Sequence, residues 1–179
     1  MSAVKLIAMR VLCILLLTGI SICVSAQDAE KKLKELKIEL LKPAAPIGTY
    51  TKAVRAGNLI FLSGHGPLKA DGSYMTGKVG KDATLEQAFM AARQTAISML
   101  STLKAEIGDL NKVKRVVKVL GMVNCTEDFT DQPKVINGFS DLIVSIYGEK
   151  GIHARSAVGV ISLPANMMVE VEMIVEVSE

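Results

Sequence analysis

The feature that most constrains the fold of this 179-residue chain is an alternation of apolar and polar residues close to its end. From Val169 to Val177 every second residue is apolar, and Glu170 and Glu172 stand between these positions. A period of two is typical of a strand that buries one face and exposes the other. The apolar stretch 154–163 just before it predicts a second strand, so the end of the chain indicates a sheet.

Helices are expected between the earlier strands. Thr84 and Gln87 have the spacing of a capping box, and apolar residues at intervals of three and four then continue to about Glu106. Residues 132–147 predict a second helix, and the valine-rich stretch 113–123 between the two predicts a central strand. Two more strands are expected before the first of these helices. The order β-β-α-β-α-β-β predicts an α+β fold in which two main helices cover one face of a single sheet.

Residues 1–26 have the features of an export signal. Lys5 and Arg10 precede an apolar run, and the small residues at 24–26, which end in Ala26, suit cleavage before Gln27. The run is short for a membrane span, so an uncleaved N-terminal anchor is the alternative. We expect an exported protein, periplasmic or secreted, with no membrane attachment once the signal is removed.

Without this signal the chain is close to neutral, because the loss of Lys5 and Arg10 leaves 19 basic against 18 acidic side chains. A near-neutral chain that lacks tryptophan attracts nucleic acid weakly, so no nucleic-acid partner is expected. Cys125 would be the one remaining cysteine and is interpreted as a buried apolar residue. His65 and His153 lack metal-ligand spacing, so we expect neither a metal ion nor a cofactor.

The mature chain divides into a short leading segment and one domain. Residues 27–43 comprise an amphipathic helix, expected over 28–41, and a proline-bearing connector. This helix would pack on the domain's own sheet or on a neighbouring subunit, and binding to a membrane surface is the alternative. Residues 44–179 are long enough for one domain with its own core.

Two residues near the end of the chain suggest binding of a small organic acid. Arg155 lies at the start of a predicted strand, and an arginine fork matches the two oxygens of a carboxylate. Glu170 on the next strand has the chemistry to hold or polarise a water molecule. From these residues alone, a solvated arginine and solvent-facing glutamates explain the pattern as readily.

Several motifs resemble those of a known family. They are PIGTY at residues 46–50, GNLIFLSGHGP at 57–67, ARS at 154–156 and VEVEMIV at 169–175. Together, in order and over about residues 44–177, they resemble the RidA (YjgF) family of enamine and imine deaminases. Differences at Thr49, His65 and Ala157 make the chain similar to the branch of that family labelled chorismate-mutase-like or endoribonuclease.

The resemblance implies a chorismate-mutase-like fold, a homotrimer and ligand clefts between its subunits. It also implies a metal-free hydrolytic deaminase that converts 2-imino or enamino acids to 2-keto acids and ammonia. The alternatives are a non-catalytic module that binds small carboxylates and, less favoured by the charge, a ribonuclease. In the family's pattern Arg155 would hold the substrate carboxylate, Glu170 would direct the attacking water and Tyr50 would orient the substrate. Further contacts with the substrate would come from Ser63, Gly64 and Asn137.

Overall fold

The computed structural model describes residues 28–43, 45–46 and 48–178, so the predicted export signal lies outside the described residues. The described elements follow the predicted order, with one short helix in front of them. The helices are α2 (Ala29–Glu35), α3 (Leu85–Ile107) and α4 (Gln132–Tyr147), with short 3-10 helices at Leu110–Lys112, Gly148–Gly151 and Pro164–Asn166. The strands are β1 (Ala53–Ala56), β2 (Leu59–His65), β3 (Val113–Asn124), β4 (Ala154–Val160) and β5 (Val169–Val177).

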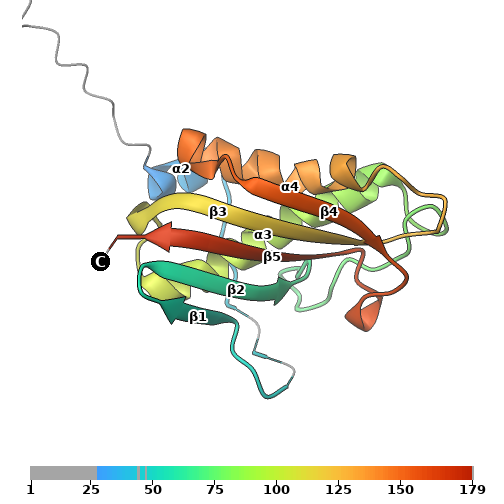
Figure 1. Ribbon diagram of the computed structural model, residues 1–179, viewed down its shortest axis with the longest axis horizontal. Helices are drawn as coiled ribbons and strands as arrows, with labels where there is room; N and C mark the ends of the chain where they lie inside the picture. The colour runs from blue at the N-terminus through green and yellow to red at the C-terminus, as the bar shows by residue number, and fades with distance from the viewer. Residues whose placement is uncertain (1–27, 44, 47, 179) are drawn as a thin grey trace, which may run out of the picture.

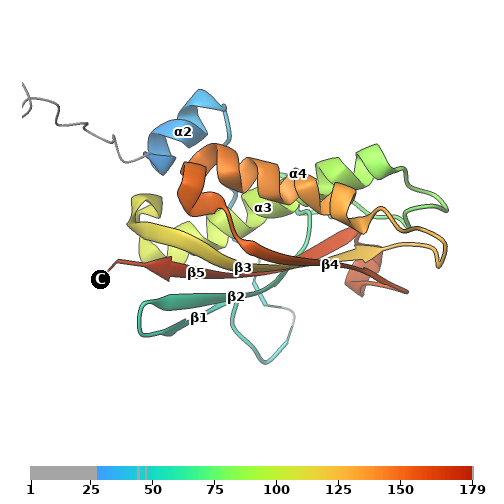
Figure 2. The ribbon, with the colours of Figure 1, turned by 45° about the horizontal axis from the view of Figure 1, so that its top comes forward.

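The strands form one sheet in the order β1-β2-β5-β3-β4, in which β1 and β4 are the edges. β3 and β4 run parallel, and the other neighbouring pairs are antiparallel. Figure 1 and Figure 2 show α3 and α4 together on one face of this sheet. The predicted α+β fold, with one sheet and its two main helices on one face, is confirmed. None of the described helices is long and apolar enough to cross a membrane.

Helix α3 begins and ends where the sequence predicts. The Thr84 hydroxyl accepts a hydrogen bond from the N–H of Gln87 at 3.2 Å, and the Gln87 side chain accepts one from the N–H of Thr84 at 2.8 Å. This capping box satisfies two backbone donors at the start of the helix. Gly108 ends the helix with a φ of 78°, a conformation that glycine adopts without strain.

Helix α2 is shorter than the helix predicted over 28–41, which was wrong at its C-terminal end. Lys37 adopts a left-handed conformation with a φ of 53°. Its N–H then bonds the Lys34 carbonyl at 3.0 Å, and the N–H of Ile38 bonds the Leu33 carbonyl at 2.9 Å. This is the Schellman arrangement that commonly ends helices, usually with glycine at the position of Lys37. Because no glycine stands there, the sequence gives no warning of the helix end.

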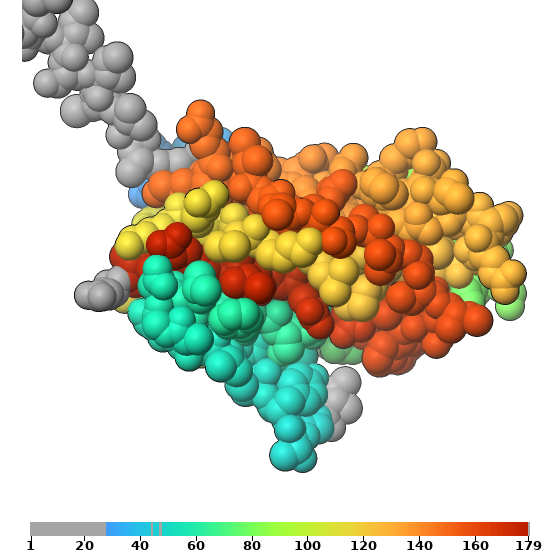
Figure 3. Space-filling view, viewed as in Figure 1, coloured from blue at the N-terminus to red at the C-terminus, as the bar shows by residue number. Residues whose placement is uncertain are grey.

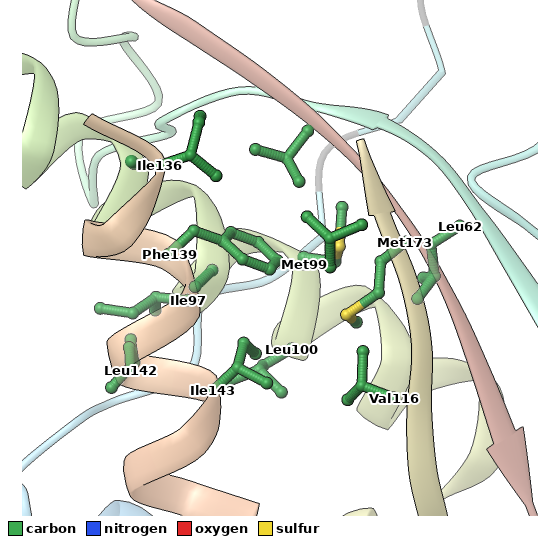
Figure 4. Packing of buried hydrophobic residues seen from close by; sticks show 14 of the residues in the cluster. Leu62, Ile97, Met99, Leu100, Val116, Ile136, Phe139, Leu142, Ile143 and Met173 are labelled. Carbon is green, nitrogen blue, oxygen red and sulfur yellow. The ribbon is translucent and has the colours of Figure 1, made fainter. Parts of the chain in front are cut away.

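Apolar side chains from α3 and α4 fill the space over the covered face of the sheet (Figure 4). Large members of this layer, each at most 1% exposed, are Met99, Leu100, Phe139, Ile143 and Met173. Burial of one such side chain contributes about 1.5–3 kcal/mol. The layer therefore fixes α4 on the sheet, and with it the candidate site residues that α4 carries.

The opposite face of the sheet is largely uncovered, and the strands reach the surface there (Figure 3). Phe61 and Val158 on this face are each 42% exposed, and Val54 is 52% exposed. A hollow of about 270 Å³ in the same face is lined in part by Val54, Phe61, Ser63 and Glu172. Apolar residues gathered on one exposed face are a feature of interaction surfaces.

Candidate functional site

Glu170 lies near the start of β5 and points to the uncovered face of the sheet. Its carboxyl group rests against Gly64 of β2, in the space that a Cβ atom at position 64 would occupy. Burial raises the pKa of this carboxyl, the negative charge of Glu172 raises it further, and the Lys52 ammonium acts in the opposite direction. A carboxylate with a raised pKa is suited to take a proton near neutral pH.

The segment before β1 lies beside Glu170. The Ser63 hydroxyl lies within hydrogen-bond distance of the Thr51 and Lys52 carbonyl oxygens, at 2.9 and 3.1 Å, and so holds this segment against β2. Lys52 Nζ lies 5.7 Å from the centre of the Tyr50 ring, and 47% of Tyr50 is exposed. Four residues predicted for the site are therefore gathered around Lys52. With Lys52 they form what we call the glutamate half-site: Tyr50, Ser63, Gly64 and Glu170.

His65 follows Gly64 and anchors this end of β2 to α3. It is 5% exposed, with Nδ1 at 2.6 Å from the Ser63 carbonyl oxygen and Nε2 at 2.8 Å from Thr102 Oγ1. Because a carbonyl only accepts, Nδ1 carries the ring hydrogen and Nε2 accepts from Thr102. Burial lowers the pKa of His65 to about 4. The ring is therefore neutral at neutral pH and supports the glutamate half-site without adding charge.

Arg155 lies in β4 on the covered face of the sheet, and three acceptors on α4 hold its guanidinium. Nη1 donates to Asn137 Oδ1 and to Ser140 Oγ, both at 3.0 Å, and Nη2 donates to the Pro133 carbonyl oxygen at 3.4 Å. Nε–H and the second Nη2–H have no partner among the described residues. In a guanidinium, Nε–H and one Nη2–H lie side by side on one edge, which is the arrangement that a carboxylate requires. Arg155 thus keeps one donor edge available for a ligand.

His153 contacts Ser140, one of the acceptors that hold Arg155. His153 Nε2 is 3.0 Å from Ser140 Oγ, and Nδ1 is 2.6 Å from the Gly151 carbonyl oxygen. Burial lowers the pKa of His153, the bond to Gly151 opposes this effect, and the charge of Arg155 adds to it. Together with the Pro133 carbonyl, these residues form what we call the arginine half-site: Asn137, Ser140, His153 and Arg155.

The two half-sites lie on opposite faces of the sheet. Arg155 is in register, through β3, with Met173 of β5, which is buried under the helices. Glu170 is in register, through β3, with Val158 of β4, which is exposed on the other face. The residues are thus two strands apart and three residues apart along the strands, roughly 10 Å in each direction. One chain by itself does not bring Arg155 and Glu170 together.

A cavity of about 630 Å³ lies next to the arginine half-site, at the start of α4. Its lining includes Phe129, Gln132 and Gly159, and Gln132 directly precedes the Pro133 whose carbonyl accepts from Arg155. Cys125 also lines it and is buried and free, as predicted. The residues of the arginine half-site do not themselves line this cavity. In the described part of the chain no cluster of three histidine, cysteine or acidic residues could hold a metal ion.

Comparison with known proteins gives a consistent result. The chain matches the family model described as "YjgF/chorismate mutase-like, putative endoribonuclease" over residues 30–177. It is 44% identical to protein TCP17 of Trypanosoma cruzi over 147 residues, or 82% of this chain and 92% of that protein. It is 30% identical to the 2-iminobutanoate/2-iminopropanoate deaminase of Dermatophagoides farinae over 131 residues, or 73% and 87% of the two chains. The structure of a "putative endoribonuclease" from Shewanella oneidensis MR-1 superposes with a TM-score of 0.81 at 28% identity, covering 84% of this chain and 99% of that one.

The single sheet and its two covering helices define a protein of the chorismate-mutase-like fold class. Within that class the chain belongs to the YjgF/RidA family, as its motifs predict.

Three polar residues of the half-sites were not predicted from the sequence: Lys52, Ser140 and His153. Each stands at a spacing that places it beside a predicted residue. Lys52 follows Tyr50 by two positions, and His153 precedes Arg155 by two, the period of an extended chain. Ser140 follows Asn137 by three, the spacing of neighbours on a helix surface. Periodicity counted from the motif residues was therefore the signal that could have found them.

Proposed function

We propose that this chain is a metal-free hydrolytic deaminase of 2-imino and enamino acids, with 2-keto acids and ammonia as products. The observation that carries the proposal is the available Nε–H and Nη2–H edge of Arg155, which α4 holds in position for a carboxylate. The raised pKa of Glu170 adds a group that can activate water. The deaminase of Dermatophagoides farinae, a relative of this chain, is named for substrates of this class.

In this proposal the reaction takes place in a cleft between two copies of the chain, within a homotrimer. Arg155 lies on the edge strand β4, which another chain can approach. Glu170 faces the uncovered side of the sheet, where the exposed Phe61 and Val158 favour contact with another copy. A copy that meets this face with its β4 edge would bring its Arg155 to Glu170. The separation of the two half-sites within one chain supports this arrangement.

Glu170 acts as the general base and Arg155 as the clamp in the proposed reaction. Glu170 takes a proton from water while the water oxygen bonds to C2, and the electron pair of the C=N bond moves to nitrogen, which takes that proton. Glu170 then removes the hydroxyl proton of the carbinolamine. As the C=O bond forms, the C–N bond breaks, and the amine leaves as ammonia with the same proton. An enamine first gains a proton at C3 and loses one from its nitrogen, and thereby becomes the imine.

The remaining residues divide between ligand contact and support. The exposed Tyr50 is placed to orient the substrate. Gly64 gives the Glu170 carboxyl the space that it occupies. The Ser63 hydroxyl is engaged by backbone carbonyls, and the Asn137 side-chain oxygen accepts from Arg155. We therefore assign Ser63 and Asn137 mainly to holding the site rather than to direct recognition.

A second candidate is a non-catalytic module that binds small carboxylates. The arginine half-site is complete within one chain and can hold a carboxylate without Glu170. This candidate predicts saturable binding of 2-keto acids with no release of ammonia.

Ammonia release from freshly generated 2-iminobutyrate distinguishes the two candidates. The protein without residues 1–26 is compared with Arg155→Ala and Arg155→Lys, and with hydrolysis in the absence of protein. We expect acceleration by the wild type and a loss in kcat/KM on the order of 10²- to 10³-fold for Arg155→Ala, because two charge-assisted hydrogen bonds disappear. Arg155→Lys should fall between them, since an ammonium lacks the planar fork.

Folded wild-type protein that binds 2-oxobutyrate without accelerating hydrolysis would replace the deaminase with the binding module. An Arg155→Ala variant with unchanged activity and unchanged 2-oxobutyrate affinity would contradict both candidates.

A further inference from the structure

A chain of hydrogen bonds runs from the Arg155 guanidinium to a backbone carbonyl. Arg155 Nη1 lies 3.0 Å from Ser140 Oγ, Ser140 Oγ lies 3.0 Å from His153 Nε2, and His153 Nδ1 lies 2.6 Å from the Gly151 carbonyl oxygen. A carbonyl oxygen only accepts, so Nδ1 carries the hydrogen and Nε2 of the neutral ring accepts. The Ser140 hydroxyl therefore donates to His153 and uses its oxygen to accept from Arg155. Every bond in this chain has one fixed direction.

Both ends of this chain are fixed to the same helix. Ser140 belongs to α4, in the turn after Asn137. At the other end, Gly151 is buried against α4, and a Cβ atom there would lie 2.8 Å from the Ile143 carbonyl oxygen. His153 therefore has little freedom to move away from Ser140. The hydrogen bonds that support Arg155 therefore connect three segments: α4, the turn at Gly151 and the start of β4.

We propose that Ser140 and His153 are positioning residues of the carboxylate site, which fix Arg155 so that its Nε–H and Nη2–H edge faces the ligand. This inference rests on the proposed carboxylate-binding role of Arg155. A long side chain that becomes ordered only on binding weakens affinity by about 2- to 10-fold. With Ser140 and His153 in place, Arg155 is ordered when the protein folds, and the ligand does not bear that loss.

Titration calorimetry with 2-oxobutyrate tests the inference without requiring turnover. Ser140→Ala should weaken binding by about 3- to 10-fold, because one of the bonds that order Arg155 is lost. Ser140→Thr keeps a hydroxyl and should restore most of the affinity. His153→Ala should weaken binding in the same direction, since Ser140 then loses its acceptor.

Ser145→Ala is the matched control. Ser145 lies on the same helix, and its hydroxyl donates to the Leu142 carbonyl at 2.7 Å. This variant should bind 2-oxobutyrate like the wild type. Unfolding midpoints of all variants show whether a change in affinity accompanies a general loss of stability.

The Arg155→Ala background separates positioning from a general structural effect. If Ser140 acts through Arg155, Ser140→Ala should weaken binding no further once Arg155 is absent. An equal loss in both backgrounds, or wild-type affinity in Ser140→Ala, would overturn the inference while leaving the proposed function standing. Wild-type affinity in Arg155→Ala, or no binding by the wild type, would instead remove the carboxylate site on which both depend.

Discussion

The two half-sites differ in how their central group is held. The Arg155 guanidinium has three hydrogen-bond acceptors on α4 and a histidine behind one of them. The Glu170 carboxylate, in contrast, accepts no hydrogen bond from the described residues, and its surroundings are a glycine, a lysine charge and a second glutamate. Hydrogen bonds thus fix the direction of the Arg155 guanidinium, whereas burial and neighbouring charges set the pKa of Glu170.

This difference matches two different chemical demands. A fork that grips a planar carboxylate must point correctly, because hydrogen-bond strength falls steeply with angle. A group that takes and returns a proton must instead have a suitable pKa, and hydrogen bonds to its charged form would lower that pKa. In the proposed function, the arginine half-site would therefore supply affinity and the glutamate half-site would supply proton transfer.

Glu170→Gln should give the largest effect and tests whether the two half-sites divide these roles. Glutamine keeps the shape of the side chain but cannot take a proton, so kcat on 2-iminobutyrate should fall by about 10²- to 10⁴-fold. Affinity for 2-oxobutyrate should change less than about 2-fold, because Arg155 is untouched. Arg155→Ala should show the opposite pattern, with a large loss of affinity. Equal losses of affinity in both variants would refute the division of roles.

Subunit mixing tests whether the half-sites meet between chains. Arg155→Ala and Glu170→Gln chains, unfolded and refolded together in equal amounts, should form an intact site at roughly a quarter of their interfaces. Ammonia release should then recover to about that fraction of the wild-type rate. The control is the same two proteins refolded separately and then combined. No recovery after joint refolding would place Arg155 and Glu170 of each working site in one chain.

His65→Gln removes the anchor of the glutamate half-site to α3. The pKa of His65 falls from its usual 6.5 to about 4 on folding, so the unfolded chain binds more protons between these values. The contribution of the neutral His65 ring to the free energy of unfolding is complete above about pH 6.5. This contribution is lost as the pH falls toward 4, and the free energy of unfolding then decreases by up to about 3 kcal/mol. Urea midpoints between pH 4 and 7 should therefore fall less in His65→Gln than in the wild type. Parallel profiles for the two proteins would show that the His65 ring is not buried as described.

The smallest expected effect is a pair of opposite shifts in the pH dependence of kcat/KM. Glu172→Gln removes a negative charge that raises the pKa of Glu170, so the acid limb should move to lower pH. Lys52→Met removes a positive charge that lowers it, so the acid limb should move to higher pH. Activity requires the deprotonated carboxylate and therefore falls as the pH drops through this pKa. Shifts in the same direction would mean that the acid limb belongs to another group.

The fold was largely predictable because its signals are local. The capping box at Thr84 and Gln87, the glycine after α3 and the alternation in β5 each depend on residues close together in the chain. The end of α2 was not predictable, since the left-handed residue there is Lys37, whose side chain gives no sign of that conformation.

The arrangement of the candidate site was less predictable for a different reason. Alternation shows that Glu170 and Glu172 share a face, but it cannot relate that face to the one on which Arg155 lies. That relation depends on the register of β4, β3 and β5, in which Arg155 and Met173 both pair with Val119. A shift of one residue in this register would have placed Arg155 and Glu170 on the same face.

Gly64 has a consequence for how this sequence can vary. The Glu170 carboxyl occupies the place of the missing Cβ atom, so even alanine at position 64 would displace it. Because only the end of a flexible side chain must move, the fold would tolerate such a change far better than the chemistry would. Positions 64 and 170 are therefore expected to change together among descendants of this chain, as residues in direct contact do. On the proposed mechanism, a descendant with a side chain at position 64 is expected to have lost proton transfer by Glu170.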